Sequence, residues 1–496
     1  MYLLGYDIGS SSIKAALVES GTRSTIKIVQ SPSDVMDIMA PETGWAEQDP
    51  ELWWQNLCQA TRNLLQSTDI NPRDIRGIGI SYQMHGLVVV DHKQNVLRPS
   101  IIWCDSRAVD TGEKAFNEIG KEKCLTQLLN SPGNFTASKL KWVQEHEPDT
   151  YKRIYKFMLP GDYIAMRLTG DIYTTISGLS EGILWDFKKN KKADFLLDHY
   201  GIDRELIPEI IPTFARQGVL RDEVAGMLGL KAGIPVCYRA GDQPNNALSL
   251  NVLKPGEVAA TGGTSGVVFG VVDRPVYDPE VRVNGFAHVN HRSGHPSVGV
   301  LLCINGAGIQ YSWIKQNFGY RKTTYQDMEM LASEVPVGSE GLRIIPFGNG
   351  AERMLGNKNI GSQLINLQLN RHRNAHVCRA ALEGVAYSFA YGIDILKEMG
   401  IPVEVMKVGN DNLFQSAIFS TTVASLAGCE IQMMKTTGAV GAAKAAGVAA
   451  GAYASIEEAL GESRIIETFT ANEDAGPYKE GFAQWKSDLE KILTDH

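Results

Sequence analysis

Two hairpin signatures about half a chain apart constrain the fold of this 496-residue sequence more than any other feature. In the first, the polar stretch Asp7–Ser12 lies between the apolar runs Tyr2–Tyr6 and Ile13–Val18. In the second, the glycine-rich stretch Gly262–Gly266 lies between two further apolar runs. An apolar run, a short polar turn and a second apolar run together predict two strands joined by a tight turn. The two matched hairpins predict two structurally related halves.

Helical and strand patterns alternate along the rest of the chain. Pro50–Gln66 has the apolar spacing of a helix, and Asp49 stands where an N-cap residue is expected. Further helices are predicted at 374–399, 413–427 and 439–450, and further strands at 75–81, 87–91 and 403–408. Alternation of this kind predicts the α/β class. A Pro-Gly turn at 255–256 places the domain boundary, which gives domains 1–250 and 251–496.

Composition argues against two classes of partner. A net charge of −8 and a pI near 5.8 argue against nucleic acid or an anionic membrane surface as the main partner. No apolar run reaches the roughly 18–20 residues that cross a bilayer. The seven cysteines are an odd number without a C-x-x-C pair, which is typical of reduced thiols. We therefore expect a cytoplasmic protein, and the sequence leaves a homodimer open.

The first turn has the composition of a phosphate-binding loop. Its backbone N–H groups and three hydroxyl groups can point at phosphate oxygens. Asp7 is a candidate ligand of Mg²⁺, which binds few carboxylates and keeps part of its water shell. The predicted phosphate-binding residues are Gly9, Ser10, Ser11, Ser12 and Lys14. The same residue types also form ordinary solvated turns, so the turn alone leaves both interpretations open.

The second turn has similar chemistry without a carboxylate, and Gly263 and Thr264 are its predicted phosphate contacts. A pair of such turns fits a nucleotide site that holds phosphates from two sides. The sequence contains neither G-x-x-x-x-G-K-[ST] nor a strand-linked G-x-G-x-x-G. P-loop and dinucleotide-binding folds are therefore excluded.

Asp242 follows the apolar run Ile234–Cys237 and is a candidate general base. A carboxylate at a strand end can accept the proton of a hydroxyl group that attacks a γ-phosphoryl group. The alternative is a structural N-cap for a helix that begins near Pro244, and spacing alone favours this alternative.

Two other side chains are candidates for binding. His85 lies in a loop between two predicted strands, and we interpret it as a binding or packing residue and not as the base. Trp103, beside Asp105 and Arg107, is the tryptophan best placed to line a polar cleft.

The order of the motifs carries a family resemblance. The chain is similar over nearly its whole length to the FGGY carbohydrate kinases. The matching segments are Asp7–Ser12, Gly44–Pro50, Gln83–Gly86, Leu97–Arg107, Leu159–Gly170, Gly241–Asp242 and Gly263–Gly266. Each motif alone is weak evidence for the resemblance, but seven motifs in the right order are specific evidence. Gln83–Gly86 has the sequence Q-M-H-G, as in family members that act on xylulose.

The resemblance implies an α/β fold of two actin-like (ribonuclease H-like) domains, with the active site in the cleft between them. It implies that residues 1–250 bind the sugar, that 251–496 bind the nucleotide, and that ATP and Mg²⁺ are used. Asp242 would be the base and, with Asp7, would hold the metal. The implied substrate-binding residues are Met84, His85, Trp103, Asp242 and Gln243. The implied nucleotide-binding residues beyond the two turns are Gly306, Gln310, Gly409 and Asn410.

The implied reaction converts ATP and D-xylulose into ADP and D-xylulose 5-phosphate. The alternatives are a kinase for L-ribulose, L-fuculose, gluconate or glycerol, and a non-catalytic actin- or Hsp70-like ATP-binding switch. Three segments depart from the family pattern. The G-G-G-A turn is Gly409–Asn412 here, and asparagine tolerates the positive φ that a glycine would supply. Gln243 replaces the usual Asn after the base, and Gly178 replaces a carboxylate.

Overall fold

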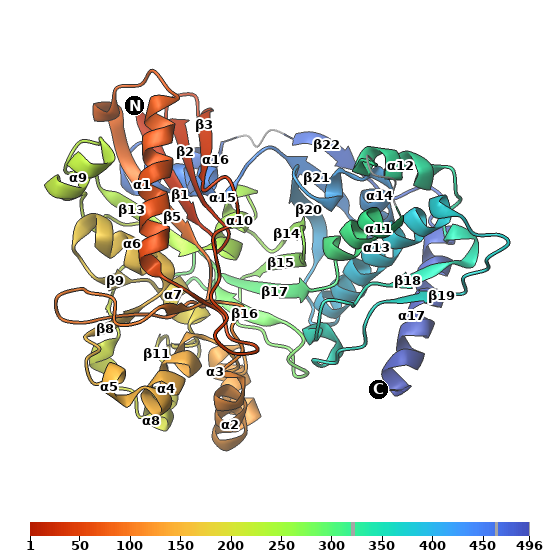
Figure 1. The fold of residues 1–496 in the computed structure, drawn as a ribbon, viewed down its shortest axis with the longest axis horizontal. Helices are drawn as coiled ribbons and strands as arrows, with labels where there is room; N and C mark the ends of the chain where they lie inside the picture. Colours follow the sequence, from red (N-terminus) through yellow and green to blue (C-terminus); the bar gives the residue numbers. More distant parts are fainter. Residues whose placement is uncertain (319–322, 462–464, 496) are drawn as a thin grey trace. The chain divides into compact units, whose positions relative to one another are not determined.

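The computed structural model describes residues 1–318, 323–461 and 465–495, and Figure 1 shows their helices and strands. The described residues form two compact units. Unit 1 comprises 1–251, 285–298 and 436–461, and unit 2 comprises the described residues of 252–284, 299–435 and 465–495. Within these described ranges, no helix is both long and apolar enough to cross a membrane.

A five-stranded sheet forms the centre of unit 1, with the strand order β13-β5-β1-β2-β3. Its strands are β1 (Tyr2–Ile8), β2 (Ile13–Glu19), β3 (Thr25–Ser31), β5 (Ile75–Tyr82) and β13 (Val236–Gly241). β1 and β2 form the predicted hairpin, and β3 pairs antiparallel with β2. β5 pairs parallel with both β1 and β13. The carboxyl ends of β1, β5 and β13 therefore meet at one edge of the sheet.

Helix α1 (Pro50–Gln66) packs on one face of this sheet and has the predicted bounds. The Asp49 carboxylate accepts a hydrogen bond from the Glu51 N–H at 2.9 Å, which satisfies a free donor of the first turn. Trp53 is fully buried in the same apolar cluster as Leu4 of β1. The helix was predictable because its cap, its apolar spacing and its burial all agree.

Helix α15 (Gly438–Ala449) packs on the opposite face, although it comes from late in the sequence. A Cβ added to Gly5 or Gly79 would lie 1.9 Å from a carbonyl oxygen of this helix, so only glycines allow so close an approach. The predicted domain 251–496 is therefore not continuous. Segments 285–298 and 436–461 belong to unit 1, and the second of them contains the alanine- and glycine-rich helix α15.

The central sheet of unit 2 includes the strand order β17-β15-β14-β20-β21-β22. These strands are β14 (Gly256–Gly262), β15 (Gly266–Val272), β17 (Val298–Ile304), β20 (Val403–Gly409), β21 (Glu430–Met434) and β22 (Ile465–Phe469). β14 and β15 form the second predicted hairpin. β20 pairs parallel with both β14 and β21.

The two sheets repeat one topology, as the paired hairpins predicted. The order β3-β2-β1-β5-β13 in unit 1 corresponds to β17-β15-β14-β20-β21 in unit 2. In each unit, a hairpin is followed on its first-strand side by two parallel strands. Two sheets built alike can position different residues at equivalent strand ends.

The predicted helix 413–427 begins later than expected. Leu413–Gln415 form a short 3-10 turn, and helix α14 (Ala417–Ala427) starts only after Ser416. The Ser416 hydroxyl accepts a hydrogen bond from the Phe419 N–H at 3.0 Å. Serine caps a helix better than it extends one, which explains the shift. The predicted long helix is α13 (Asn374–Glu398).

The remaining elements are short or peripheral. The other helices are α2 (Val109–Ile119), α3 (Lys121–Leu128), α4 (Thr136–His146), α5 (Pro148–Tyr151), α6 (Pro160–Thr169), α7 (Ile176–Glu181), α8 (Asp194–Tyr200), α9 (Asp222–Leu228), α10 (Asp242–Ser249), α11 (Gly308–Phe318), α12 (Tyr325–Ser333), α16 (Ile456–Leu460) and α17 (Gly476–Asp495). The other strands are β4 (Glu47–Gln48), β6 (Val88–Val90), β7 (Ser100–Ile101), β8 (Lys156–Met158), β9 (Tyr173–Thr174), β10 (Trp185–Asp186), β11 (Lys191–Lys192), β12 (Glu209–Ile210), β16 (Asn284–Ala287), β18 (Arg343–Ile345) and β19 (Gln363–Ile365).

Candidate active site

Asp7 and Asp242 lie at the same edge of the unit 1 sheet. Asp7 is near the end of β1, and Asp242 directly follows β13. Both strands flank β5, where Asp7 is in register with Ser81 and Gly241 is in register with Tyr82. The structure thus brings together the two carboxylates that the sequence singled out.

The charges of these carboxylates influence each other. Burial and, secondly, the negative charge of Asp7 together raise the pKa of Asp242 to about 7, against the lowering effect of the backbone N–H groups at the helix start. Burial also raises the pKa of Asp7, and the charge of the neighbouring Lys14 lowers it. A carboxylate with a pKa near 7 is suited to accept a proton at physiological pH.

The alternative role for Asp242 as a helix N-cap is wrong. Helix α10 begins at Asp242 itself, Gly241 occupies the cap position, and no side chain caps the helix. Asp242 remains partly exposed, as does Gln243 beside it. The carboxylate therefore has no capping function and is available for chemistry.

Oxygen atoms without hydrogen-bond partners gather near the same edge. They are Gln83 Oε1, Asn245 Oδ1 and both carboxylate oxygens of Glu181. Asn245 is fully buried, and its Nδ2 donates to the Gly438 carbonyl at 2.9 Å, which leaves the oxygen free. A Cβ on Gly438 would lie 2.7 Å from Asp7 Oδ2, so Asn245 and Asp7 are close neighbours. A buried unpaired polar atom calls for an explanation, such as a catalytic role or a bound ion or water.

These oxygen donors fit a magnesium ion. Mg²⁺ is usually held by one or two carboxylates and completed by water and substrate phosphates. The described part of the chain contains no cluster of three or more acidic, histidine or cysteine groups arranged for a metal. A cation at this edge would thus rest on Asp7 and Asp242, with ligands from water or phosphate.

The first hairpin turn is held firmly by its surroundings. The Gly9 N–H donates to the Ser12 carbonyl at 3.1 Å and closes the turn. Gln48 Nε2 donates to the Ser10 carbonyl at 2.7 Å. The Trp103 indole N–H donates to Ser10 Oγ at 3.3 Å, although the Trp103 side chain is half exposed. Ser11 is exposed at the tip, where its groups can reach a ligand.

The loop that contains Met84 and His85 follows β5 at the same edge. His85 has a positive φ of 62°, which is uncommon for a residue other than glycine. Its ring Nδ1 donates to the Glu181 carbonyl at 2.9 Å. The fully buried Lys139 ammonium group donates to the His85 carbonyl at 3.0 Å, and burial lowers the pKa of Lys139 to about 7. Sequence reasoning missed Lys139, because nothing local marks it.

Unit 2 has a cavity of about 590 Å³ at the tip of the second hairpin. The Gly308 N–H donates to the Gly263 carbonyl, and the Ile309 N–H donates to the Thr264 carbonyl, both at 3.0 Å. A Cβ on Gly308 would lie 2.2 Å from the Gly263 oxygen, so this contact requires glycine. A cavity of this size accommodates a nucleotide-sized ligand.

Aromatic and polar side chains that the sequence did not reveal form the wall of this cavity. The Tyr311 and Tyr325 rings stack with centroids 5.5 Å apart. Tyr325 is 48% exposed, so a ligand can reach it. Glu329 accepts hydrogen bonds from the Ser416 hydroxyl at 2.6 Å and the Ile418 N–H at 3.0 Å. An exposed aromatic side chain beside polar groups suits a purine base.

The other predicted nucleotide-binding residues lie beside this cavity and do not line it. Gly306 is buried, and its N–H donates to Glu352 at 2.8 Å. Gln310 is buried and accepts a hydrogen bond from the Ser362 hydroxyl at 2.8 Å. Gly409 and Asn410 precede the lining residues Asp411 and Asn412. None of residues 409–412 has a positive φ, and the side-chain oxygen of Asn412 accepts a hydrogen bond from the Phe414 N–H in the following turn.

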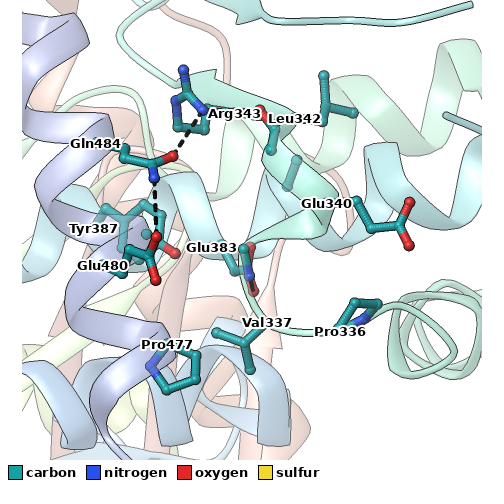
Figure 2. A pocket seen from close by; sticks show the side chains of 14 residues that line it. Pro336, Val337, Glu340, Leu342, Arg343, Glu383, Tyr387, Pro477, Glu480 and Gln484 are labelled. Atoms are coloured by element: carbon teal, nitrogen blue, oxygen red, sulfur yellow. Dashed lines mark hydrogen bonds between the residues drawn. The ribbon is translucent and has the colours of Figure 1, made fainter. Parts of the chain in front are cut away.

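A second, polar cavity of about 280 Å³ lies elsewhere in unit 2. Figure 2 shows Gln484 between Arg343 and Glu480, accepting from the first at 3.3 Å and donating to the second at 3.4 Å. Glu383 and Tyr387 of α13 also line it. The side chains that line this cavity include none of the residues predicted for the active site.

The fold and these two sites define a class of protein. The solved xylulose kinase from Rhodospirillum rubrum superposes with a TM-score of 0.88 at 24% identity, over 100% of both chains. This likeness shows a shared two-domain fold of the actin-like type.

The sequence comparisons then identify the family. Residues 2–249 match the N-terminal domain, and residues 258–450 the C-terminal domain, of the FGGY family of carbohydrate kinases. The curated xylulose kinase of Staphylococcus xylosus is 31% identical over 433 residues, covering 86% of this chain and 87% of that one. That of Escherichia coli (strain K12) is 30% identical over 467 residues, covering 93% and 92%. The chain belongs to the FGGY family of carbohydrate kinases, and it is an ATP-using enzyme of that class.

Proposed function

We propose that this carbohydrate kinase transfers the γ-phosphoryl group of ATP to the primary hydroxyl group of D-xylulose. The products are D-xylulose 5-phosphate and ADP. The observation that carries the proposal is the placement of Asp7 and Asp242 at one strand edge beside the Gln83–Gly86 loop. The two curated xylulose kinases that match most of the chain support the choice of sugar.

Asp242 is the general base of the proposed reaction. Its carboxylate accepts the proton of the sugar hydroxyl as the oxygen bonds to the γ-phosphorus. The bond from that phosphorus to the bridging oxygen breaks, and ADP leaves with the electron pair. Met84, His85, Trp103 and Gln243 position the sugar, and Lys139 holds the His85 backbone in place.

Asp7 and Asp242 would hold the magnesium ion of this site. When bound, the ion supplies positive charge that neutralises the phosphate oxygens. Gly9, Ser10, Ser11, Ser12 and Lys14 of unit 1 provide further donors for phosphate oxygens.

Unit 2 binds the nucleotide in this proposal. The 590 Å³ cavity offers Tyr325 to the base and the backbone of Gly263 and Thr264 to the phosphates. Gly306, Gln310, Gly409 and Asn410 support the walls around it. We place the reaction in the cytoplasm, where ATP is available and the seven thiols, none in a disulfide, stay reduced. A homodimer stays a prediction, which light scattering on the purified protein tests.

A panel of sugars in a coupled ADP-release assay tests the function. We expect the highest kcat/KM with D-xylulose and lower values with L-ribulose, L-fuculose, gluconate and glycerol. A higher value for another acceptor would move the assignment to that sugar. Nucleotide binding by calorimetry without turnover of any acceptor would instead indicate an ATP-binding switch.

A further inference from the structure

Glu181, at the end of α7, is a buried polar group that the proposed reaction does not use. Its side chain is 1% exposed, and neither carboxylate oxygen has a hydrogen-bond partner. The Tyr82 hydroxyl lies near enough to lower the pKa of this carboxyl, yet the two groups form no hydrogen bond of acceptable geometry. An unpaired buried carboxyl is costly for the fold, so its presence calls for a compensating role.

The Glu181 carboxyl lies between the base and the sugar loop. A Cβ built on Gly241 would lie 2.3 Å from Glu181 Oε2 and 2.6 Å from Met84 Cγ. Both side chains therefore cover the backbone that immediately precedes Asp242. The Glu181 carbonyl also accepts the hydrogen bond from the His85 ring at 2.9 Å. Glu181 thus contacts the His85 ring and lies beside the residue that precedes Asp242.

The carboxyl group of Glu181 offers two oxygen atoms to a polar ligand. Burial raises the pKa of Glu181 well above its ordinary value, and the neighbouring Asp242 and Asp162 carboxylates raise it further. Asp162 is itself paired with Arg239 at 3.0 Å, so Arg239 does not compensate Glu181 directly. A carboxyl group accepts hydrogen bonds at its oxygens, which matches the hydroxyl group of a sugar.

We propose that Glu181 is a specificity-determining residue, whose carboxyl group, with the Tyr82 hydroxyl, binds a hydroxyl group of the acceptor sugar other than the one phosphorylated. This inference rests on the proposed function, because it places the acceptor at Asp242. Binding of the sugar satisfies the oxygens that the free protein leaves unpaired. An acceptor without the matching hydroxyl leaves them unpaired and is rejected.

The test compares wild-type protein with Glu181→Met and Glu181→Gln, using D-xylulose and its monodeoxy analogues as acceptors. Methionine has a similar shape but no polar atoms, so thermal stability stays equal or rises if the carboxyl has no structural partner. We expect the KM for D-xylulose to rise on the order of ten- to hundredfold in Glu181→Met, with the KM for ATP within about twofold. Glutamine keeps the size and a donor, so Glu181→Gln retains part of the affinity.

The deoxy series identifies the contact. Wild-type protein rejects the analogue that lacks the bound hydroxyl, and Glu181→Met treats that analogue and D-xylulose alike. Equal discrimination in wild type and both variants overturns the inference and indicates that a water molecule or nothing meets the carboxyl. If Glu181→Met fails to fold, the same ratios for Glu181→Gln decide. A wild-type protein that phosphorylates D-xylulose leaves the proposed function intact whatever the variants do, whereas one that phosphorylates no sugar overturns both.

Discussion

The two units present different chemistry on the same strand order. Near the end of its first hairpin strand, unit 1 has Asp7 opposite Lys14, whereas unit 2 has Thr261 opposite Val267. Unit 1 adds Asp242 after β13, where its electrostatic neighbour is Asp7. Charge and unpaired polar atoms thus concentrate in unit 1. The corresponding part of unit 2 offers neutral backbone groups and a roomy cavity.

This difference shows how one strand topology, present twice, can support two different functions. A hairpin next to two parallel strands supplies a turn and two strand ends, whatever residues they carry. Carboxylates at those ends suit proton transfer and metal binding. Gly308 at the start of α11 lets this helix approach the turn of unit 2, where the cavity leaves room for a nucleotide. Substitutions in the two units should therefore change different kinetic constants.

The largest effect is expected at the base in unit 1. Asp242→Asn removes the proton acceptor while it keeps the shape of the side chain, so kcat should fall about 10²- to 10⁴-fold. The affinity for ADP, measured by calorimetry, should stay within about twofold because the nucleotide cavity is in unit 2. A variant with full activity would show that Asp242 is not the general base.

The second expected effect concerns the partner carboxylate. Asp7→Asn should lower kcat on the order of 10- to 100-fold, as for other residues that support a metal site. The negative charge of Asp7 raises the pKa of Asp242, so its removal should lower that pKa. Protonated Asp242 cannot accept a proton, and activity is lost as pH falls through its pKa. The acidic limb of kcat/KM for the sugar should therefore move to lower pH in Asp7→Asn at saturating Mg²⁺. An acidic limb that stays at the same pH or moves to higher pH would contradict the electrostatic coupling between Asp7 and Asp242.

The third prediction addresses the cavity in unit 2. Tyr325→Ala should raise the KM for ATP about tenfold, because stacking on an aromatic face contributes on the order of 1–3 kcal/mol per base. The KM for the sugar should not change. Tyr155→Ala is a matched control, since Tyr155 is a partly exposed tyrosine of unit 1 that lies outside both sites. Equal ATP kinetics in the two variants would rule out Tyr325 as the base platform.

The smallest predicted effects compare two helix caps. Asp49→Ala and Ser416→Ala should each lower the free energy of unfolding by about 1 kcal/mol, because each removes a side-chain acceptor from a first turn. Only Ser416 lines the nucleotide cavity, where it also donates to Glu329. Thermal unfolding should therefore respond to both changes, and the KM for ATP to Ser416→Ala alone. A change in the KM for ATP in Asp49→Ala would contradict the separate roles of the two units.

Local signals predicted much of the fold. The helix at Pro50–Gln66 and both hairpins could be predicted because apolar spacing, turn residues and the Asp49 cap all lie close together in the sequence. The packing of α15 in unit 1 could not be predicted, because the composition of this helix indicates close packing without indicating the sheet that it packs against. The close approach of Gly5 and Gly79 to the helix backbone shows that partner in the folded protein.

The candidate site likewise contains residues that the sequence could predict and residues that it could not. Asp7, Asp242 and the two turns carry motifs, and the sheet register then places the two carboxylates at one edge. Lys139, Glu181 and Tyr325 carry no motif, because their neighbours come from segments far away in the sequence. Their roles depend on burial and contact, which a sequence does not display.

A crystal structure with ADP and D-xylulose bound tests the division between the two units most directly. The account predicts that the O5 hydroxyl of the sugar lies within hydrogen-bonding distance of the Asp242 carboxylate and that the adenine ring stacks on Tyr325. A sugar bound away from the edge formed by β1, β5 and β13, or an adenine ring outside the cavity at Gly263, would contradict it.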